Sequence, residues 1–376
     1  MTALMERTPL YEQHVQAGAN MVDFHGWEMP IRYGQIPAEH QKVRLSAGLF
    51  DLCHMGRLEF IGKDAEKWVQ SVVTQDLATM KVGDARYSLV CNDEGGILDD
   101  VIVYKLPHST LLVVNASNRE KIVSWFEAHR PSDCDATLVD RSREWGMIAV
   151  QGPQTVRILS ELVKLPEFSN WDHFDYYHVA RGLALGKEIL VARTGYTGED
   201  GVELYAPTEL TASLWNAVLE SGGPRVAPVG LGARDTLRCE AGMPLYGNEL
   251  SEQTNPYEAK LGFAVKLEKP VPFVGQGALK AIKAAGVARR LVGFRVDSRR
   301  VARGGMTLFR GEEQVGVITS GIPSPTLGFP IALGYLDSKV TEPDGLWVDI
   351  RGIRSRVNPE PLPFFSRTRR RGDRAL

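Results

Sequence analysis

Residues 85–106, ARYSLVCNDEGGILDDVIVYKL, predict a β-hairpin that decides the fold class. Residues 85–92 and 101–106 are rich in β-branched and aromatic side chains, and they flank the turn residues Asp93-Glu94-Gly95-Gly96. Such runs around a glycine-containing turn are typical of paired antiparallel strands. A third strand is expected at residues 110–115, and helices are expected at residues 38–47, 64–73 and 119–129. Strands and helices mix without regular alternation, which indicates an α+β fold.

A comparable order of elements recurs farther along the chain, with strands expected at residues 145–151, 189–193 and 202–206 and a helix at residues 210–221. We therefore expect two related, interleaved α+β domains over residues 1–275. A linker-like stretch at residues 266–277 covers the end of this region. Over residues 285–376, short strands separated by Gly, Pro and Asp turns predict a separate C-terminal domain, a small β-barrel or sandwich.

The bulk composition excludes several classes of protein. With 376 residues, the chain is too long for one typical core. A net charge of -2 argues against nucleic-acid binding, because nucleic-acid binders carry a basic excess. No run approaches the roughly 18 apolar residues of a membrane span, and the N-terminus lacks a secretory apolar segment, so a cytoplasmic protein without membrane contact is expected. The four cysteines are far apart in the sequence, which favours reduced thiols.

Three common ligand-binding motifs fail. Gly182-x3-Gly186-Lys187 is one residue too short for a phosphate loop, and Glu188 follows where a Ser or Thr is needed. Asp235 occupies the third-glycine position after Gly230-Leu231-Gly232, which breaks the dinucleotide pattern. There is no HExxH, and the eight histidines are scattered, so no metal is expected.

Two carboxylates, Asp99 and Asp100, enter the predicted strand after the turn, with apolar neighbours on both faces. Since side chains alternate along a strand, Asp100 shares a face with Ile102 and Tyr104, and Asp99 points to the other side. Burial of a carboxylate is costly without a partner, so such a group is a candidate for proton handling. The alternative is an edge strand whose aspartates cap the turn. The pattern alone does not choose between Asp99 and Asp100.

Two further segments carry candidate binding residues. Residues 193–204, RTGYTGEDGVEL, form a glycine-rich turn where backbone can approach a ligand closely, with Glu203 inside the next strand. Residues 230–242, GLGARDTLRCEAG, place Arg234 near the start of a helix, beside glycines. The alternatives are an ordinary glycine-rich hairpin in the first case and, in the second, a solvated arginine or a helical ion pair.

Together these groups suit a folate-type ligand. A pterin presents a ring N–H next to an amino group, a donor pair that a carboxylate accepts. The benzoyl-glutamate tail presents carboxylates, which arginine binds bidentately. The aromatic ring between them requires Tyr or Phe walls, and a nearby acid would supply proton transfer.

The chain resembles the glycine cleavage T-protein family over nearly its whole length. Besides the three segments above, the resemblance is carried by TPLY at residues 8–11, MVDFHGWEMP at 21–30, FDLCHMG at 50–56, LYGNE at 245–249 and TSGIPSPTLG at 319–328. It implies a three-domain cloverleaf with tetrahydrofolate in a central channel. It also implies that the chain transfers the one-carbon unit of an aminomethyl group, carried on the lipoyl arm of H-protein, to tetrahydrofolate, which yields 5,10-methylene-tetrahydrofolate, ammonia and a dihydrolipoyl arm.

The same resemblance assigns individual roles. It implies that Asp100 is the catalytic carboxylate, Glu203 the pterin-binding residue and Arg234 a folate-contacting arginine. It implies that Met55, Tyr87 and Tyr196 line the pocket. It also implies a basic folate contact from the C-terminal run, assigned to Arg367.

Two other functions stay open. One is a folate-dependent demethylase of the same superfamily. The other is a non-catalytic folate-binding protein, although the Lys-Gly-Cys-Tyr motif of that class is absent.

Overall fold

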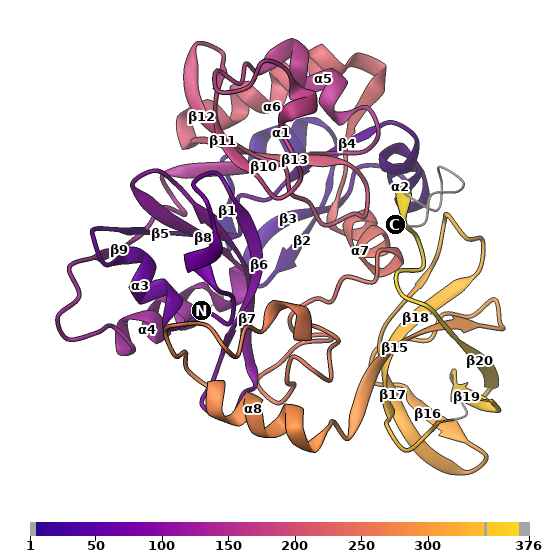
Figure 1. Ribbon diagram of the computed structural model, residues 1–376. Coiled ribbons are helices and arrows are strands. Elements are labelled where there is room, and N and C mark those ends of the chain that lie inside the picture. Colours follow the sequence, from indigo (N-terminus) through magenta and orange to yellow (C-terminus); the bar gives the residue numbers. More distant parts are fainter. Residues whose placement is uncertain (1–4, 342–343, 368–376) are drawn as a thin grey trace. The chain divides into compact units, whose positions relative to one another are not determined.

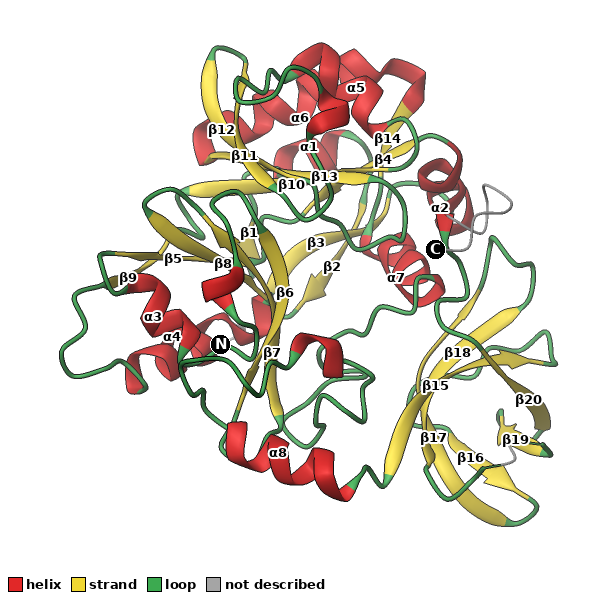
Figure 2. Cartoon of the chain, in the orientation of Figure 1, coloured by secondary structure: helices red, strands yellow, loops and turns green. Residues whose placement is uncertain are grey.

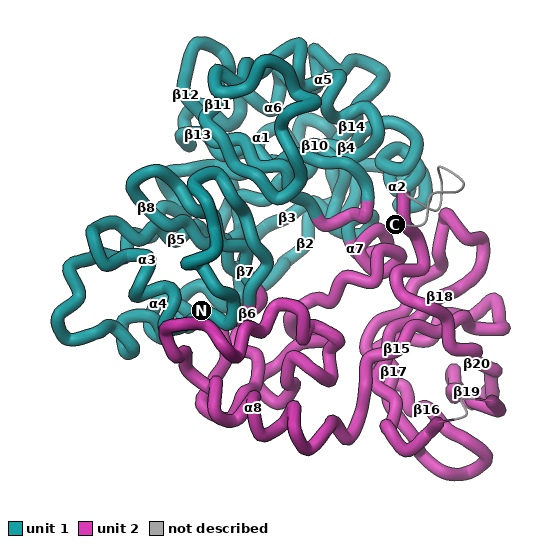
Figure 3. Tube along the Cα trace, viewed as in Figure 1, with its two compact units in different colours: residues 1–88, 101–195, 199–234 teal, residues 89–100, 196–198, 235–376 magenta. Residues whose placement is uncertain are grey.

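A computed structural model describes residues 5–341 and 344–367. The described chain forms two compact units (Figure 3). Unit 1 contains the described residues within 1–88, 101–195 and 199–234, and unit 2 contains those within 89–100, 196–198 and 235–376. The division passes through two strands, β6 (Ala85–Cys91) and β7 (Ile97–Lys105).

The larger sheet of unit 1 has the strand order β11-β12-β13-β10-β4-β14 (Figure 1). Its bounds are β4 Ala47–Asp51, β10 Trp145–Gln151, β11 Val179–Ala184, β12 Lys187–Ala192, β13 Gly201–Pro207 and β14 Val226–Pro228. All pairings are antiparallel except that of β14 with β4. Figure 2 shows α5 (Thr155–Leu162) and α6 (Thr208–Gly222) against this sheet, where Ile158 and Trp215 join a core with Val150 and Leu204.

A second sheet has the order β6-β7-β8-β5-β9, with β5 at Gly56–Ile61, β8 at Ser109–Val114 and β9 at Thr137–Asp140. In unit 1, helices α3 (Ala65–Gln70) and α4 (Arg119–Ala128) contribute Trp68 and Phe126, whose rings pack with Phe60 of β5. A small third sheet joins β1 (Glu6–Arg7), β3 (Trp27–Arg32) and β2 (Asn20–Phe24). Unit 1 also contains helices α1 (Tyr11–Gln16) and α2 (Ile36–Leu45). Its 3-10 turns are Leu77–Thr79, Ala116–Asn118, Trp171–His173 and Gly223–Arg225.

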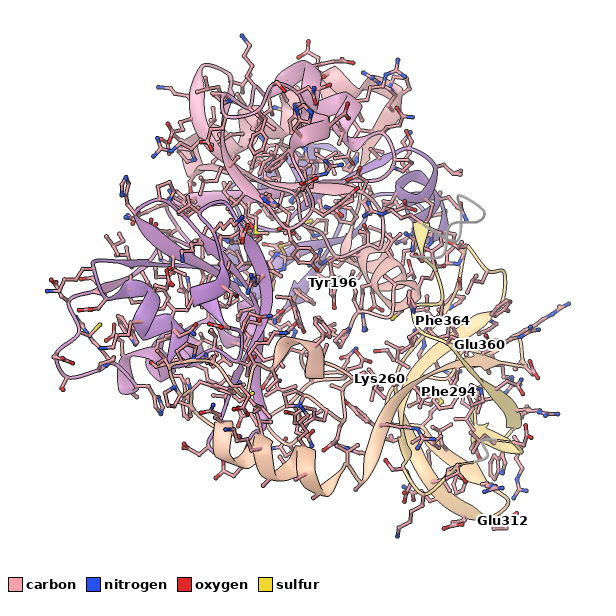
Figure 4. All side chains as sticks on the ribbon, in the orientation of Figure 1. Tyr196, Lys260, Phe294, Glu312, Glu360 and Phe364 are labelled. Carbon is pink, nitrogen blue, oxygen red and sulfur yellow. The ribbon has the colours of Figure 1, made fainter. Side chains whose placement is uncertain are left out.

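Unit 2 contains a closed barrel in the order β15-β18-β17-β16-β19-β20. Its strands are β15 Arg289–Val296, β16 Thr307–Arg310, β17 Glu313–Pro323, β18 Pro330–Asp337, β19 Leu346–Asp349 and β20 Arg354–Glu360. Phe294, labelled in Figure 4, belongs to the barrel core with Leu308 and Val348. A 3-10 turn at Gly262–Ala264 and α8 (Gln276–Ala285) precede the barrel, and α7 (Leu231–Glu240) begins in unit 1 and continues into unit 2.

The α+β class and the C-terminal β-barrel are both confirmed. Other expectations needed correction. The helix expected at residues 38–47 is α2, Ile36–Leu45, because Ala47 already starts the fully buried strand β4. Strands β2 and β3 were not expected, since Pro30 and the charged residues of this segment obscure any alternation of side chains.

The four cysteines are free thiols, of which Cys134 is half-buried and Cys53, Cys91 and Cys239 are buried. Burial raises the pKa of the Cys91 thiol to about 12 and also raises the pKa of the Cys53 and Cys239 thiols. Among the described residues, no helix is long and apolar enough to cross a membrane.

Candidate functional site

Glu203 is a buried carboxylate in the middle of strand β13, with 8% of its surface exposed. Its chain neighbours Val202 and Leu204 are fully buried. The residues directly opposite on the adjacent strands are Ala149 of β10 and Ala192 of β12. Because opposed residues of antiparallel strands share a face, these small side chains leave room beside the carboxylate.

Three hydroxyl groups surround one oxygen of this carboxylate. Oε2 of Glu203 accepts hydrogen bonds from Thr194 Oγ1 at 2.6 Å and from the hydroxyls of Tyr104 and Tyr205 at 3.2 Å each. Burial raises the pKa of both tyrosines well above the ordinary value, and the nearby charge of Glu203 raises it further. Both phenols therefore stay protonated and act as donors.

Tyr177, whose pKa responds to the charge of the same carboxylate, has a strained backbone conformation. Its φ is 57°, in the left-handed region, which costs a bulky residue roughly 1–2 kcal/mol. Two main-chain hydrogen bonds hold it there, from its own N–H to Arg193 O (3.0 Å) and from Ala85 N–H to its carbonyl (2.7 Å). The residue is 50% exposed, and the pKa of its phenol is raised by partial burial and by the charge of Glu203. Strain of this kind concentrates at functional sites.

Asp99 and Asp100 differ clearly in burial. Asp99 is fully buried, at 0% exposure, and Asp100 is partly exposed. The partly exposed Ile102 shares the Asp100 face, and the buried Val101 shares the Asp99 face. Strand β7 lies between β6 and β8 in the sheet, and its pairing with β8 covers Ile102–Lys105, beyond the two aspartates.

Two buried ions hold the turn that carries Met55. Before the turn, Asp51 accepts hydrogen bonds from Cys53 N–H (2.8 Å), Thr8 Oγ1 (2.6 Å) and His14 Nε2 (2.8 Å). After the turn, the guanidinium of Arg57 donates to four main-chain carbonyls, those of Cys53, Met55, Ser142 and Trp145. The turn is thus fixed at both ends, and Met55 remains half-buried between them.

His54 in the same turn is a neutral, buried imidazole. It is 3% exposed, its ring meets the Phe24 ring edge-on at 5.6 Å, and its Nδ1 has no hydrogen-bond partner among the described residues. Burial lowers its pKa to about 3. The charges of Arg234 and Arg57 lower it as well, whereas that of Asp51 opposes them. The field of Arg234 therefore reaches this turn.

The start of α7, which positions Arg234, packs closely on residues 31–36. Glu39 accepts hydrogen bonds from the N–H groups of Tyr33 (2.6 Å), Gly34 (2.7 Å) and Gly230 (2.9 Å). A Cβ at Gly230 would lie 2.5 Å from the main chain of Ile31. The glycine is thus required by packing between two segments of unit 1.

The glycine-rich turn has a similar explanation. A Cβ at Gly195 or Gly201 would lie 2.0 Å or 2.2 Å from the side chain of Gln151. The Nε2 of Gln151 donates to the carbonyl of Thr194 at 3.2 Å. These two glycines make room for Gln151, and β12 and β13 on either side pair as a hairpin.

The predicted site residues fall into both units. Met55, Tyr87, Glu203 and Arg234 belong to unit 1, and Asp100, Tyr196 and Arg367 belong to unit 2. The hydroxyl of Tyr196, labelled in Figure 4, donates to Pro244 O at 2.5 Å. Glu203 is buried, and the other six are partly exposed.

Sequence reasoning missed Tyr104, Thr194 and Tyr205 as partners of Glu203, and it missed Tyr177. Tyr104 and Thr194 lie inside the quoted motifs and Tyr205 directly follows one of them, but no sequence pattern joins Tyr104 to Glu203, which is 99 residues away.

Two surface clefts lie apart from these residues. One of about 650 Å³ in unit 2 is lined by residues 295–299 and by residues 323–330 in part, and one of about 290 Å³ in unit 1 includes Glu59, Lys105 and Arg181. Among the described side chains, no group of three or more His, Cys, Asp or Glu could hold a metal ion.

Comparisons with known proteins agree over both parts of the chain. The profile described as GCVT N-terminal domain matches residues 10–269, and that of the glycine cleavage T-protein C-terminal barrel domain matches residues 289–366. An aminomethyltransferase of Rubrobacter xylanophilus is 45% identical, with 97% of this chain and 95% of that protein covered. An aminomethyltransferase of Saccharopolyspora erythraea is 44% identical, with coverage of 96% and 98%. The crystal structure of glycine cleavage system aminomethyltransferase T from Bartonella henselae matches with a TM-score of 0.88 and 32% identity, covering 96% of this chain and 98% of that one.

Proposed function

The chain belongs to the glycine cleavage T-protein family and is an aminomethyltransferase, and from this premise we propose how its residues serve the reaction. The donor is the aminomethyl group on the lipoyl arm of H-protein, and the acceptor is tetrahydrofolate. The carbon–sulfur bond to the lipoyl arm and the carbon–nitrogen bond to the amine break. Two bonds from the same carbon to folate nitrogens form. The products are 5,10-methylene-tetrahydrofolate, ammonia and a dihydrolipoyl arm.

The observation that carries the folate part of the proposal is the buried Glu203 carboxylate. It is an anion in the interior of a sheet, flanked by alanines and paired with no cation that the structure records. A buried carboxylate in such surroundings suits a ligand that presents N–H donors. The pterin ring supplies such donors on one edge.

Arg234 would bind the opposite end of the folate. Arg234 is a partly exposed residue near the start of α7, a helix that Glu39 fixes through Gly230. A guanidinium matches the carboxylates of the glutamate tail in bidentate geometry. Met55, Tyr87 and Tyr196 would line the walls for the rings between these two ends, and Arg367 would add a basic contact.

Asp100 is the residue to which we assign proton handling. It is partly exposed, whereas Asp99 is sealed in the core and cannot meet a ligand without rearrangement. A carboxylate there would orient the folate and take up the proton that frees the attacking nitrogen. The remaining rate gain would come from holding the aminomethyl carbon and folate nitrogen in line.

One assay tests the proposal as a whole. Aminomethylated H-protein is mixed with the chain, and ammonia and methylene-tetrahydrofolate are measured with and without tetrahydrofolate. We expect both products to form together and only slowly without folate. If the chain instead consumes an N-methyl amine with folate and ignores aminomethylated H-protein, it is a demethylase and the proposal is wrong.

A further inference from the structure

We propose that Tyr104, Thr194 and Tyr205 are positioning residues, whose hydroxyls bind one oxygen of Glu203 so that the other oxygen alone meets the ligand. The inference rests on the proposed folate-binding role of Glu203. It changes the expected contact, because a carboxylate held in this way does not bind the pterin donor pair through both oxygens.

The hydrogen bonds of Glu203 are strongly one-sided. The three hydroxyls, which we call the hydroxyl cluster, lie 2.6 Å, 3.2 Å and 3.2 Å from Oε2. Oε1 has no hydrogen-bond partner among the described residues. A carboxylate oxygen has two lone pairs, and the hydroxyl cluster surrounds those of Oε2. A further donor is accommodated only at Oε1.

The protons of the hydroxyl cluster all lead to the carboxylate. Tyr104 also lies 2.9 Å from the Tyr205 hydroxyl and 3.1 Å from Thr194 Oγ1. Each hydroxyl has one proton, and an ionised carboxylate is an acceptor only. Whichever way the contacts between hydroxyls are directed, every chain of hydrogen bonds ends at Oε2. The network is therefore complete when Oε2 carries no proton.

The cluster is rigid as well as complete. Tyr104 and Tyr205 are 0% and 2% exposed, and their rings meet edge-on at 5.9 Å. Tyr205 is two residues from Glu203 in β13 and thus on the same face of the sheet. Thr194 follows β12, which pairs with β13, and Tyr104 comes from β7 of the other sheet. Three separate attachments leave Glu203 one orientation.

This arrangement predicts the effect of replacing Glu203 with glutamine. Its amide oxygen would face the hydroxyl cluster, which offers only donors. Its NH2 group would then replace Oε1 and oppose the N–H donors of a pterin. Glu203→Gln should therefore fold normally but lose folate affinity by roughly ten- to a hundredfold, the value of a charge-assisted contact.

Thr194→Val tests the cluster directly, since it removes one hydroxyl at nearly constant volume. Tetrahydrofolate binding is measured by calorimetry. We expect affinity to fall roughly three- to tenfold, with the KM for folate rising more than kcat falls. Tyr205→Phe and Tyr104→Phe should behave alike, and Thr194→Ser should restore binding. The matched control is Thr211→Val, a buried threonine whose hydroxyl bonds only Pro207 O among the described residues.

The double variant Thr194→Val/Glu203→Gln separates positioning from general damage. If Thr194 acts through Glu203, the double variant binds folate within about twofold of Glu203→Gln alone, because coupled residues are not additive. Full additivity, or cluster variants that fold and bind folate as the native chain does, overturns the inference. A native chain that binds no tetrahydrofolate overturns the proposed function instead.

Discussion

His54 and Asp51 are buried titratable groups three positions apart, and both make acid unfavourable for the folded chain. For Asp51, burial tends to raise the pKa, but the hydrogen bonds from His14 and Thr8 outweigh it, so the pKa is lowered overall. The stability that Asp51 contributes is present above its unfolded pKa and is lost as pH falls through the folded value. For His54, burial lowers the pKa to about 3, so the folded chain resists protonation that the unfolded chain accepts near 6.5.

The pH dependence of stability follows from these signs. Between about pH 6.5 and 3, the unfolded chain binds one proton more at His54 than the folded chain does. The free energy of unfolding should therefore fall with acid, with a contribution from this residue of about 1.4 kcal/mol per pH unit. Urea denaturation from pH 4 to 8 measures the slope. His54→Leu should reduce this slope by the amount that corresponds to nearly one bound proton. His108→Leu, at an exposed position, should leave the slope unchanged. Equal slopes in all three chains would refute this reading.

Asp99 and Asp100 offer a direct comparison of two adjacent carboxylates. Asp100→Asn keeps the size but removes the anionic acceptor, so turnover should fall by about 10²–10⁴-fold, with folate affinity much less affected. Asp99→Asn alters a fully buried group, and it should act on stability and leave turnover within about tenfold. Methylene-tetrahydrofolate formation and melting curves are measured side by side. A less active Asp99→Asn enzyme would reverse the assignment.

At the level of elements, the sequence predicted strands better where turn chemistry accompanied the apolar pattern. The hairpin of β6 and β7 follows from Asp93-Glu94-Gly95-Gly96, and β7 is longer than expected because it already begins at Ile97. Strands β2 and β3 were missed, since Pro30 breaks any regular alternation there. Their pairing depends on a turn in which His25, with φ 53°, and Gly26, with φ 84°, adopt the left-handed region.

The junction between residues 31–36 and α7 gives a prediction at this scale. Gly230→Ala would place a methyl group 2.5 Å from the main chain of Ile31, which cannot shift alone. We expect a loss of roughly 2–3 kcal/mol in the free energy of unfolding, the usual cost of overpacking. Folate affinity should also fall, because α7 carries Arg234, to which we assign a folate contact. Gly277→Ala in α8 is the control, since nothing lies within 4 Å of its added Cβ, and it should be neutral or stabilising by up to about 1 kcal/mol. Equal urea midpoints for the two variants would contradict the account.

At the scale of the whole molecule, the α+β class and the C-terminal β-barrel were predictable from local sequence patterns. The division of the chain into two compact units was not. Strands β6 and β7 each contribute residues to both units, and hydrophobic periodicity says nothing about such a division. The site shows the same limit. Asp100, Glu203 and Arg234 lie in recognisable motifs, but the contact of Tyr104 with Glu203 joins residues 99 positions apart. Contacts of this kind depend on how one sheet packs on another.

Ligand binding should be visible in the melting temperature of the whole chain. A ligand at a hundred times its Kd stabilises the folded state by about 2.7 kcal/mol. For 376 residues this corresponds to a rise of roughly 3 °C with tetrahydrofolate. Prior treatment with a chelator should leave the rise unchanged, because the predicted ligand contacts use no metal. A rise that disappears after chelation would show that a metal takes part in binding.

The unequal burial of the four cysteines has a practical consequence for spectroscopy. Thiolate is the species that reacts with maleimides, and Cys53, Cys91 and Cys239 are buried thiols with raised pKa. Cys134, in the segment between α4 and β9, is the half-buried thiol of the four. A fluorescent maleimide should therefore attach at this one place in the native chain, without any engineered substitution. The product would be a uniformly labelled enzyme whose emission anisotropy would report binding of the proposed partner, H-protein.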